Sequence, residues 1–176
     1  TPPLLTNYTI NVDTGMMIFN FNEPVTLSSF DPTAFTIQSD GDLSANGASS
    51  FNITGGSTTR SLDGLQVQLA MLIADVNVLK ADEGLATDIS TTHLSFAANA
   101  VRDTSGNGIV AVADDTGVQV IDHADDSTRP VLAAFDANFN AGTITLVFNE
   151  TVDSSTLNVT AITLQASTSA NSDRAH

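Results

Sequence analysis

Apolar and polar residues alternate along several short segments of this chain. In residues 17–21 and 144–148, apolar side chains recur at every second position, which is typical of a half-buried β-strand. A turn with Gly15 or Gly142 precedes each strand, and the first strand forms a predicted β-hairpin with residues 4–8. Other short apolar segments, separated by Gly, Asp and Ser turns, predict strands at residues 34–38, 49–54, 65–69, 93–96, 109–112 and 118–121.

Residues 72–82 have a different period. Their apolar positions, starting at Leu72, fall at i, i+1, i+4 and i+7, which is a helical stripe. Gly84 is placed to end this helix. The pattern as a whole predicts an all-β fold, a β-sandwich with one short helix that crosses between its two sheets.

The chain also contains an internal repeat. Residues 1–38 align with residues 128–165 at a shift of 127 without a gap, and about 14 of these 38 positions are identical. This similarity predicts one complete module over residues 1–127 and the N-terminal part of a second module over residues 128–176. We therefore expect this segment to belong to a longer array of such modules.

Composition narrows the classes of partner. The chain has 20 acidic and 5 basic side chains, a formal net charge of −15, which opposes binding to nucleic acid or to anionic lipid. Its 41% hydrophobic residues are sufficient for a core. There is no cysteine, which leaves the redox compartment open. No apolar run reaches the length of about 18 residues that a membrane span requires, so no membrane insertion is expected for this segment.

Three motifs carry a resemblance to a known family. They are the strand end Phe-Asn-Glu-Pro-Val at 21–25, the hairpin Val-Arg-Asp-Thr-Ser-Gly-Asn at 101–107 and the strand Thr-His-Leu-Ser at 92–95. With them, residues 1–165 resemble tandem bacterial-type Ig-like repeats (adhesin or SWM-like β-sandwich repeats) of large cell-surface proteins, which also occur in microalgal surface and flagellar-hair proteins. The resemblance implies an Ig-like sandwich in an extracellular rod or filament of many modules.

Carboxylates are concentrated at the predicted module junction, residues 122–130. Calcium takes six to eight oxygen ligands, so acids of the junction and of the module bodies are candidates for a calcium site. The candidate ligands are Glu23, Asp103, Asp122, Asp125, Asp126 and Glu150. The alternative is a solvated acidic linker, kept extended by charge repulsion and by Pro130.

A second acidic segment, residues 103–114, has oxygen ligands at positions 1, 3, 5 and 12 and a glycine at position 6, as an EF-hand loop does. Its flanks are predicted strands, however, whereas an EF-hand requires helices. Asn107-Gly108 is also a strong signal for a type I′ turn. We therefore favour a hairpin turn over a calcium loop at this segment.

No motif for a nucleophile, a zinc site or a phosphate-binding loop is present, so no enzymatic activity is expected. The histidines are predicted at a sheet face (His93), on the linker surface (His123) and at the terminus (His176). Four Asn-x-Thr sequons are candidate glycosylation sites, at Asn7, Asn52, Asn149 and Asn158. With one Tyr and no Trp, the chain offers no aromatic platform for sugars, and its Phe residues are predicted in the core.

Two functions are compatible with these features. The first is a non-enzymatic extracellular structural repeat that builds or spaces a surface fibre, filament or adhesin stalk, with neighbouring repeats and identical subunits as partners. The alternative is a calcium-dependent adhesive module that binds a glycan or a cell-surface protein. In either case the second hairpin has apolar residues to cover, and we expect residues 128–165 to be ordered only against more chain or a neighbouring subunit.

Overall fold

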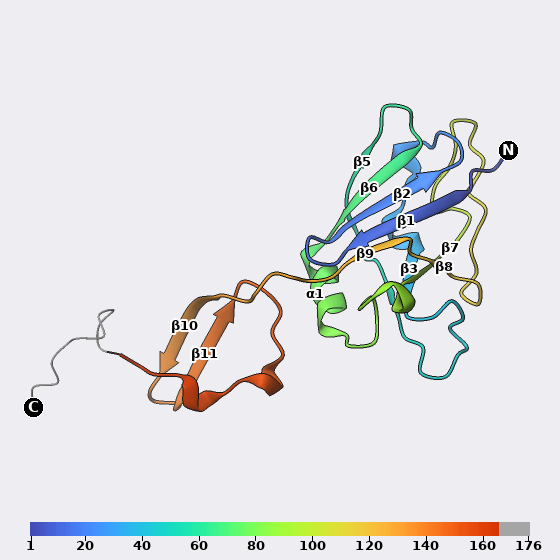
Figure 1. Cartoon of the computed structure of the whole chain (residues 1–176). Coiled ribbons are helices and arrows are strands. Elements are labelled where there is room, and N and C mark those ends of the chain that lie inside the picture. Colours follow the sequence, from blue (N-terminus) through green and yellow to red (C-terminus); the bar gives the residue numbers. More distant parts are fainter. Residues whose placement is uncertain (166–176) are drawn as a thin grey trace, which may run out of the picture.

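The computed structural model describes residues 1–165 and contains two β-sheets, one α-helix and a separate hairpin (Figure 1). The strands are β1 (Leu5–Asn11), β2 (Met16–Phe21), β3 (Phe35–Gln38), β4 (Ser50–Asn52), β5 (Gly56–Arg60), β6 (Gln66–Met71), β7 (His93–Phe96), β8 (Val118–Gln119), β9 (Asp122–Ala124), β10 (Leu132–Asn138) and β11 (Thr143–Phe148). The helix is α1 (Ile73–Ala81), and short 3₁₀ turns lie at Leu27–Ser29, Pro32–Ala34, Ile89–Thr91, Ser154–Thr156 and Val159–Ala161. The predicted all-β class is confirmed.

Two sheets enclose the core. The first has the order β5-β6-β2-β1-β9 and the second the order β4-β3-β7-β8. Phe19 on β2 and Phe35 on β3 face each other across the sheets with ring centroids 5.0 Å apart, and Phe96 on β7 lies 5.3 Å from Phe35. Both Phe19 and Phe35 are fully buried. The alternation of apolar residues along the strands therefore builds one core between two sheets.

Helix α1 connects β6 of the first sheet to β7 of the second, as predicted from residues 72–82. Val76 and Leu79 form its buried stripe. The helix ends at Ala81, one residue before the predicted end, with Asp82 rather than Gly84 at its end: Asp82 is the C-cap, and the backbone N–H of Gly84 donates to the Asp82 carboxylate at 2.9 Å. The prediction that Gly84 ends the helix was therefore wrong.

Three strand predictions differ from the structure. Residues 109–112 form no strand and contain one isolated bridge, between Val112 and Phe96. Strand β5 was not predicted, because its sequence is polar and shows no apolar alternation. It lies at the edge of the sheet and pairs only with β6. Strand β9 lies in the predicted linker and pairs with β1 in parallel, so the acidic linker begins later than expected.

The second hairpin, β10–β11, repeats the register of the first. Leu5 pairs with Phe21 and is followed by a register shift, and Leu132 pairs with Phe148 in the same way. The same hydrogen bond also joins the two strands at the open end of each hairpin. The Leu4 N–H donates to Asn22 Oδ1, and the Val131 N–H donates to Asn149 Oδ1, both at 2.7 Å.

The two hairpins differ in burial. The first lies within the sandwich, where Tyr8 and Met17 are fully buried. Their counterparts at the 127-residue shift, Phe135 and Ile144, are 59% and 45% exposed. In Figure 1 the second hairpin stands apart from the two sheets, joined to them near α1. Among residues 1–165, no helix is long and apolar enough to cross a membrane.

Candidate functional site at the module junction

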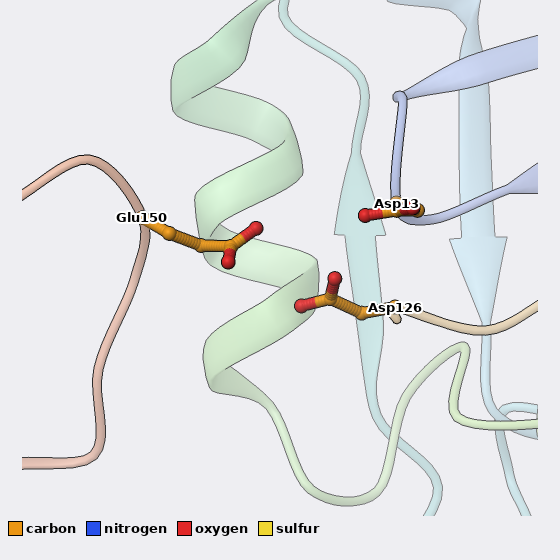
Figure 2. Close-up of side chains that lie close together, drawn as sticks. All are labelled: Asp13, Asp126 and Glu150. Atoms are coloured by element: carbon orange, nitrogen blue, oxygen red, sulfur yellow. The ribbon is translucent and has the colours of Figure 1, made fainter. Parts of the chain in front are cut away.

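Three carboxylates meet where the sandwich joins the second hairpin. Asp13 comes from the turn between β1 and β2, Asp126 from the segment after β9, and Glu150 from the loop after β11. One carboxylate oxygen of each lies within 4.8 Å of the others. Figure 2 shows the three side chains directed toward one another beside α1. We refer to these three residues as the acidic junction cluster.

A lysine from α1 neutralises part of this cluster. The Lys80 ammonium lies 2.5 Å from Glu150 Oε1, 3.2 Å from Asp126 Oδ1 and 4.0 Å from Asp13 Oδ1. Its side chain is only 6% exposed. This burial alone would lower the pKa of Lys80, but the hydrogen bonds to Glu150 and Asp126 outweigh it, so the pKa is raised. Lys80 is the single lysine of the chain.

The cluster keeps an excess of negative charge, because three carboxylates face one ammonium. Two of its buried oxygens, Asp13 Oδ1 and Glu150 Oε2, have no hydrogen-bond partner. These residues are the ones in the described chain that could hold a metal, since oxygen ligands suit a hard cation. The Lys80 ammonium lies among the same oxygens, and it would have to share them with a metal or move aside.

The linker is also fastened to the sandwich through Asp13. Ser127 Oγ donates to Asp13 Oδ2 at 3.1 Å. The Thr128 N–H donates to Asp126 Oδ1 at 3.2 Å. Hydrogen bonds to Asp13, led by that from the Thr128 side chain, hold the pKa of its carboxyl below the usual value. Ser127 thus contacts the sandwich at Asp13, while residues 125–130 stay exposed to solvent.

Of the six candidate calcium ligands, the structure brings two together, Asp126 and Glu150. Asp13 and Lys80 were not among the predicted ligands, because they lie in a turn and on a helix far from the linker in sequence. One feature of the sequence pointed to Lys80, which is the one lysine in a chain with 20 acidic residues.

The other four candidates have different surroundings. Glu23 Oε1 accepts a hydrogen bond from Thr1 Oγ1 at 3.3 Å. Asp122 lies in β9 and is exposed. Asp125 Oδ1 lies 2.9 Å from His123 Nδ1. Asp103 closes a turn within the sandwich. Calcium binding stays a prediction, and the residues now best placed for it are Asp13, Asp126 and Glu150.

His123 is not a surface residue, as was expected for a linker position. Its side chain is 2% exposed, and its Nε2 lies 2.8 Å from the Ala86 carbonyl oxygen. Both ring nitrogens thus face acceptors, the Ala86 carbonyl and the Asp125 carboxylate. His93, predicted on a sheet face, lies in β7. The prediction for His176 falls outside the described residues.

The segment after residue 103 is a turn, as favoured, but it is centred earlier than Asn107-Gly108. The Asp103 N–H donates to the Asn107 carbonyl at 3.0 Å, and Gly106 has the positive φ of 85°. Gly108 is required for another reason, because a side chain there would overlap the Ala98 carbonyl oxygen. The Asp103 carboxylate accepts hydrogen bonds from this turn, and those oxygens are thereby used within the sandwich.

The four sequon asparagines all use the side-chain oxygen as an acceptor. The donors are Asn20 Nδ2 to Asn7, Thr36 Oγ1 to Asn52, the Val131 N–H to Asn149, and Thr160 to Asn158. Asn52, Asn149 and Asn158 are exposed, whereas Asn7 is half-buried. Glycosylation of these residues stays a prediction.

No protein-family model and no curated protein matches the chain. Three solved chains of the surface layer protein SbsC are similar, each with a TM-score of 0.44. They are its domains 1–6 at 17% identity, the N-terminal part of this bacterial S-layer protein at 16%, and rSbsC(31-844) at 15%. The matches cover 84%, 84% and 78% of this chain, which spans 18%, 31% and 15% of theirs. Similarity at this level does not by itself assign a role to this chain.

Proposed function

We propose that this chain is part of a non-enzymatic structural protein of the cell exterior, in which β-sandwich modules follow one another to build or space a surface fibre, layer or stalk. The observation that carries the proposal is the junction. A second copy of the opening hairpin begins directly after the sandwich, with the same register and the same terminal hydrogen bonds. It is attached to the sandwich by the buried Lys80–Glu150 ion pair.

This arrangement suits a mechanical role. A flexible linker would let neighbouring modules rotate independently, whereas side-chain contacts on both sides of the linker restrict their relative orientation. Here Ser127 and Thr128 bind the turn at Asp13, and Glu150 binds α1. The function of such a chain lies in the spacing and orientation of its modules, and its partners are neighbouring modules of the same kind.

Immunogold electron microscopy on intact source cells tests the proposal. An antiserum against the folded 176-residue chain should label the outside of non-permeabilised cells, along fibres or a surface layer. Serum depleted with the same chain serves as the control and should give no label. Gold particles confined to the interior of sectioned cells, with bare surfaces, would refute the proposed role.

A further inference from the structure

We infer that the face of the sandwich around Thr1, Glu23 and Pro24 is a docking surface for the Lys80 end of a second copy of the same module. The inference rests on the proposed function, because it requires that modules follow one another. It goes further by naming the two faces that meet and the ion pair that joins them.

Glu150 corresponds to Glu23 at the shift of 127, and both follow the second strand of the same hairpin. The preceding asparagine makes the same backbone hydrogen bonds in both copies: Asn22 exchanges them with Leu4, and Asn149 with Val131. Glu23 is therefore held on its hairpin as Glu150 is, and Glu150 is the residue that binds α1.

Among the described residues, Glu23 lacks the cation that its counterpart Glu150 has. The Glu150 side chain is 9% exposed and contacts Lys80. In residues 1–165, Glu23 takes part in no ion pair, and its one hydrogen bond comes from the hydroxyl of Thr1. No other lysine exists in the chain to supply an ammonium. A second Lys80 can come only from another copy of the module.

The neighbouring residues fit the same partner. Thr1 corresponds to Thr128, which binds Asp13 and Asp126 at the junction. Thr1 and Glu23 lie in contact, so the pair presents together what Thr128 and Glu150 present. Pro24 is exposed and corresponds to Thr151, which shares a surface hollow with Asn77, Val78 and Ala81 of α1. The 46% exposed Val78 gives Pro24 an apolar neighbour there.

A tandem chain tests the inference, with residues 1–127 added before the intact 176-residue chain. Lys80 of the added copy then stands 70 residues before Glu23 of the intact part, which is the separation of Lys80 and Glu150. Changing Lys80→Arg in the intact part leaves one lysine in the tandem. The readout is the rate at which a small amine-acylating reagent modifies that lysine, measured by mass spectrometry. Carboxylates around an ammonium raise its pKa and so lower the fraction of lysine that is present as the reactive free amine. Each pKa unit changes this fraction, and therefore the acylation rate, about tenfold.

We expect acylation to be slow in the tandem and to speed up about tenfold with Glu23→Gln. The control Asp42→Asn removes one charge from the same module away from this face and should leave the rate unchanged. Glu150→Gln in the 176-residue chain calibrates the readout and should also expose Lys80. Circular dichroism spectra and melting curves confirm that each variant is folded.

Equal reactivity with and without Glu23, in tandems where the Glu150 calibration responds, would overturn the inference. If the Glu150→Gln change has no effect, the ion pair on which it depends is absent and the inference falls as well. Neither result alters surface labelling of cells, so failure here can be distinguished from failure of the proposed structural role.

Discussion

At the scale of single residues, much of the acidic charge serves turns rather than a binding site. Asp42, Asp88 and Asp153 each accept hydrogen bonds from a residue two positions later, and Asp63 accepts from the Ser61 hydroxyl and then from the Leu65 N–H. These bonds hold the pKa of each carboxyl below its usual value. Such side chains replace the backbone partners that turns leave without hydrogen bonds. The net charge of −15 is therefore distributed over local structure, and only part of it gathers at the junction.

Asp103 gives the first prediction at this scale. Its Oδ1 accepts from the N–H groups of Ser105 and Asn107, both at 2.8 Å, and its Oδ2 accepts from Asn107 Nδ2 at 2.7 Å. These bonds, led by that from the Asn107 side chain, lower the pKa of Asp103 below its usual 3.8. A carboxyl with a lower pKa in the folded chain stabilises the fold above the unfolded pKa, and this contribution is lost as the pH falls through the folded pKa.

Asp103→Asn should therefore lower the melting temperature at pH 7, and the difference from wild type should shrink as the pH falls below about 4. Thermal melts from pH 7 to pH 2.5 measure it. Asp136→Asn is the matched control, since that carboxylate is exposed and makes no hydrogen bond in the described chain. A difference between Asp103→Asn and wild type that is constant over this pH range would contradict the assigned role.

At the scale of elements, local patterns predicted the parts of the fold that carry their own periodicity. The alternation in residues 17–21 and the helical stripe of 72–82 gave β2 and α1 nearly to the residue. Strand β9 has no such signal, since Asp122-His123-Ala124 is extended only because β1 offers an edge to pair with. The junction cluster was missed in part for the same reason. Asp126 lies in the predicted junction and Glu150 is the repeat counterpart of Glu23, so the sequence could indicate both. Asp13 and Lys80 join them only through the tertiary fold.

The turn between β1 and β2 provides a prediction at this scale. Gly15 has a φ of 71°, and a methyl group there would overlap Val76 Cγ2 of the buried helix stripe. Gly15→Ala should lower the free energy of unfolding for two reasons. The left-handed backbone costs about 1–2 kcal/mol, and overpacking against α1 costs about 1–3 kcal/mol. Gly47→Ala is the control, because Gly47 has a φ of 87° and open space around it.

Urea unfolding of both variants separates the two effects. The free energy of unfolding should fall by about 1–2 kcal/mol for Gly47→Ala and by clearly more for Gly15→Ala. Adding Val76→Ala to the Gly15→Ala chain should recover part of the second effect, because it removes the overlapping methyl groups. Equal losses for the two glycine variants would show that the hairpin does not pack closely on α1.

At the scale of the whole molecule, the junction joins three parts of the chain that are distant in sequence. The first hairpin supplies Asp13, the helix supplies Lys80, and the second hairpin supplies Glu150. The hydrophobic core is complete without the second hairpin, since its buried residues run from Tyr8 to Val120. Electrostatics and hydrogen bonds, rather than a shared core, therefore connect one module to the next. Such a contact restricts the relative orientation of two modules, while each module keeps its own core.

The junction also decides how the predicted calcium site should behave. With Lys80 present, the ammonium competes with any cation for the oxygens of Glu150 and Asp126. Lys80→Met leaves three carboxylates within 4.8 Å of one another and no positive charge among them. We therefore expect Ca²⁺ to bind Lys80→Met about tenfold or more tightly than wild type, because removing a unit charge a few ångströms away changes the interaction with a divalent ion by more than 1 kcal/mol.

Isothermal titration with CaCl₂ up to the millimolar range of extracellular sites measures this difference, starting from protein treated with chelator. The double variant Lys80→Met with Glu150→Gln should lose the gain, since it removes one of the three ligands. Small-angle scattering adds a structural readout: without Ca²⁺, Lys80→Met should have a larger and more variable radius of gyration than wild type, and Ca²⁺ should restore the compact value. If Lys80→Met neither binds Ca²⁺ nor loosens the second hairpin, the acidic junction cluster is not what holds the two modules together.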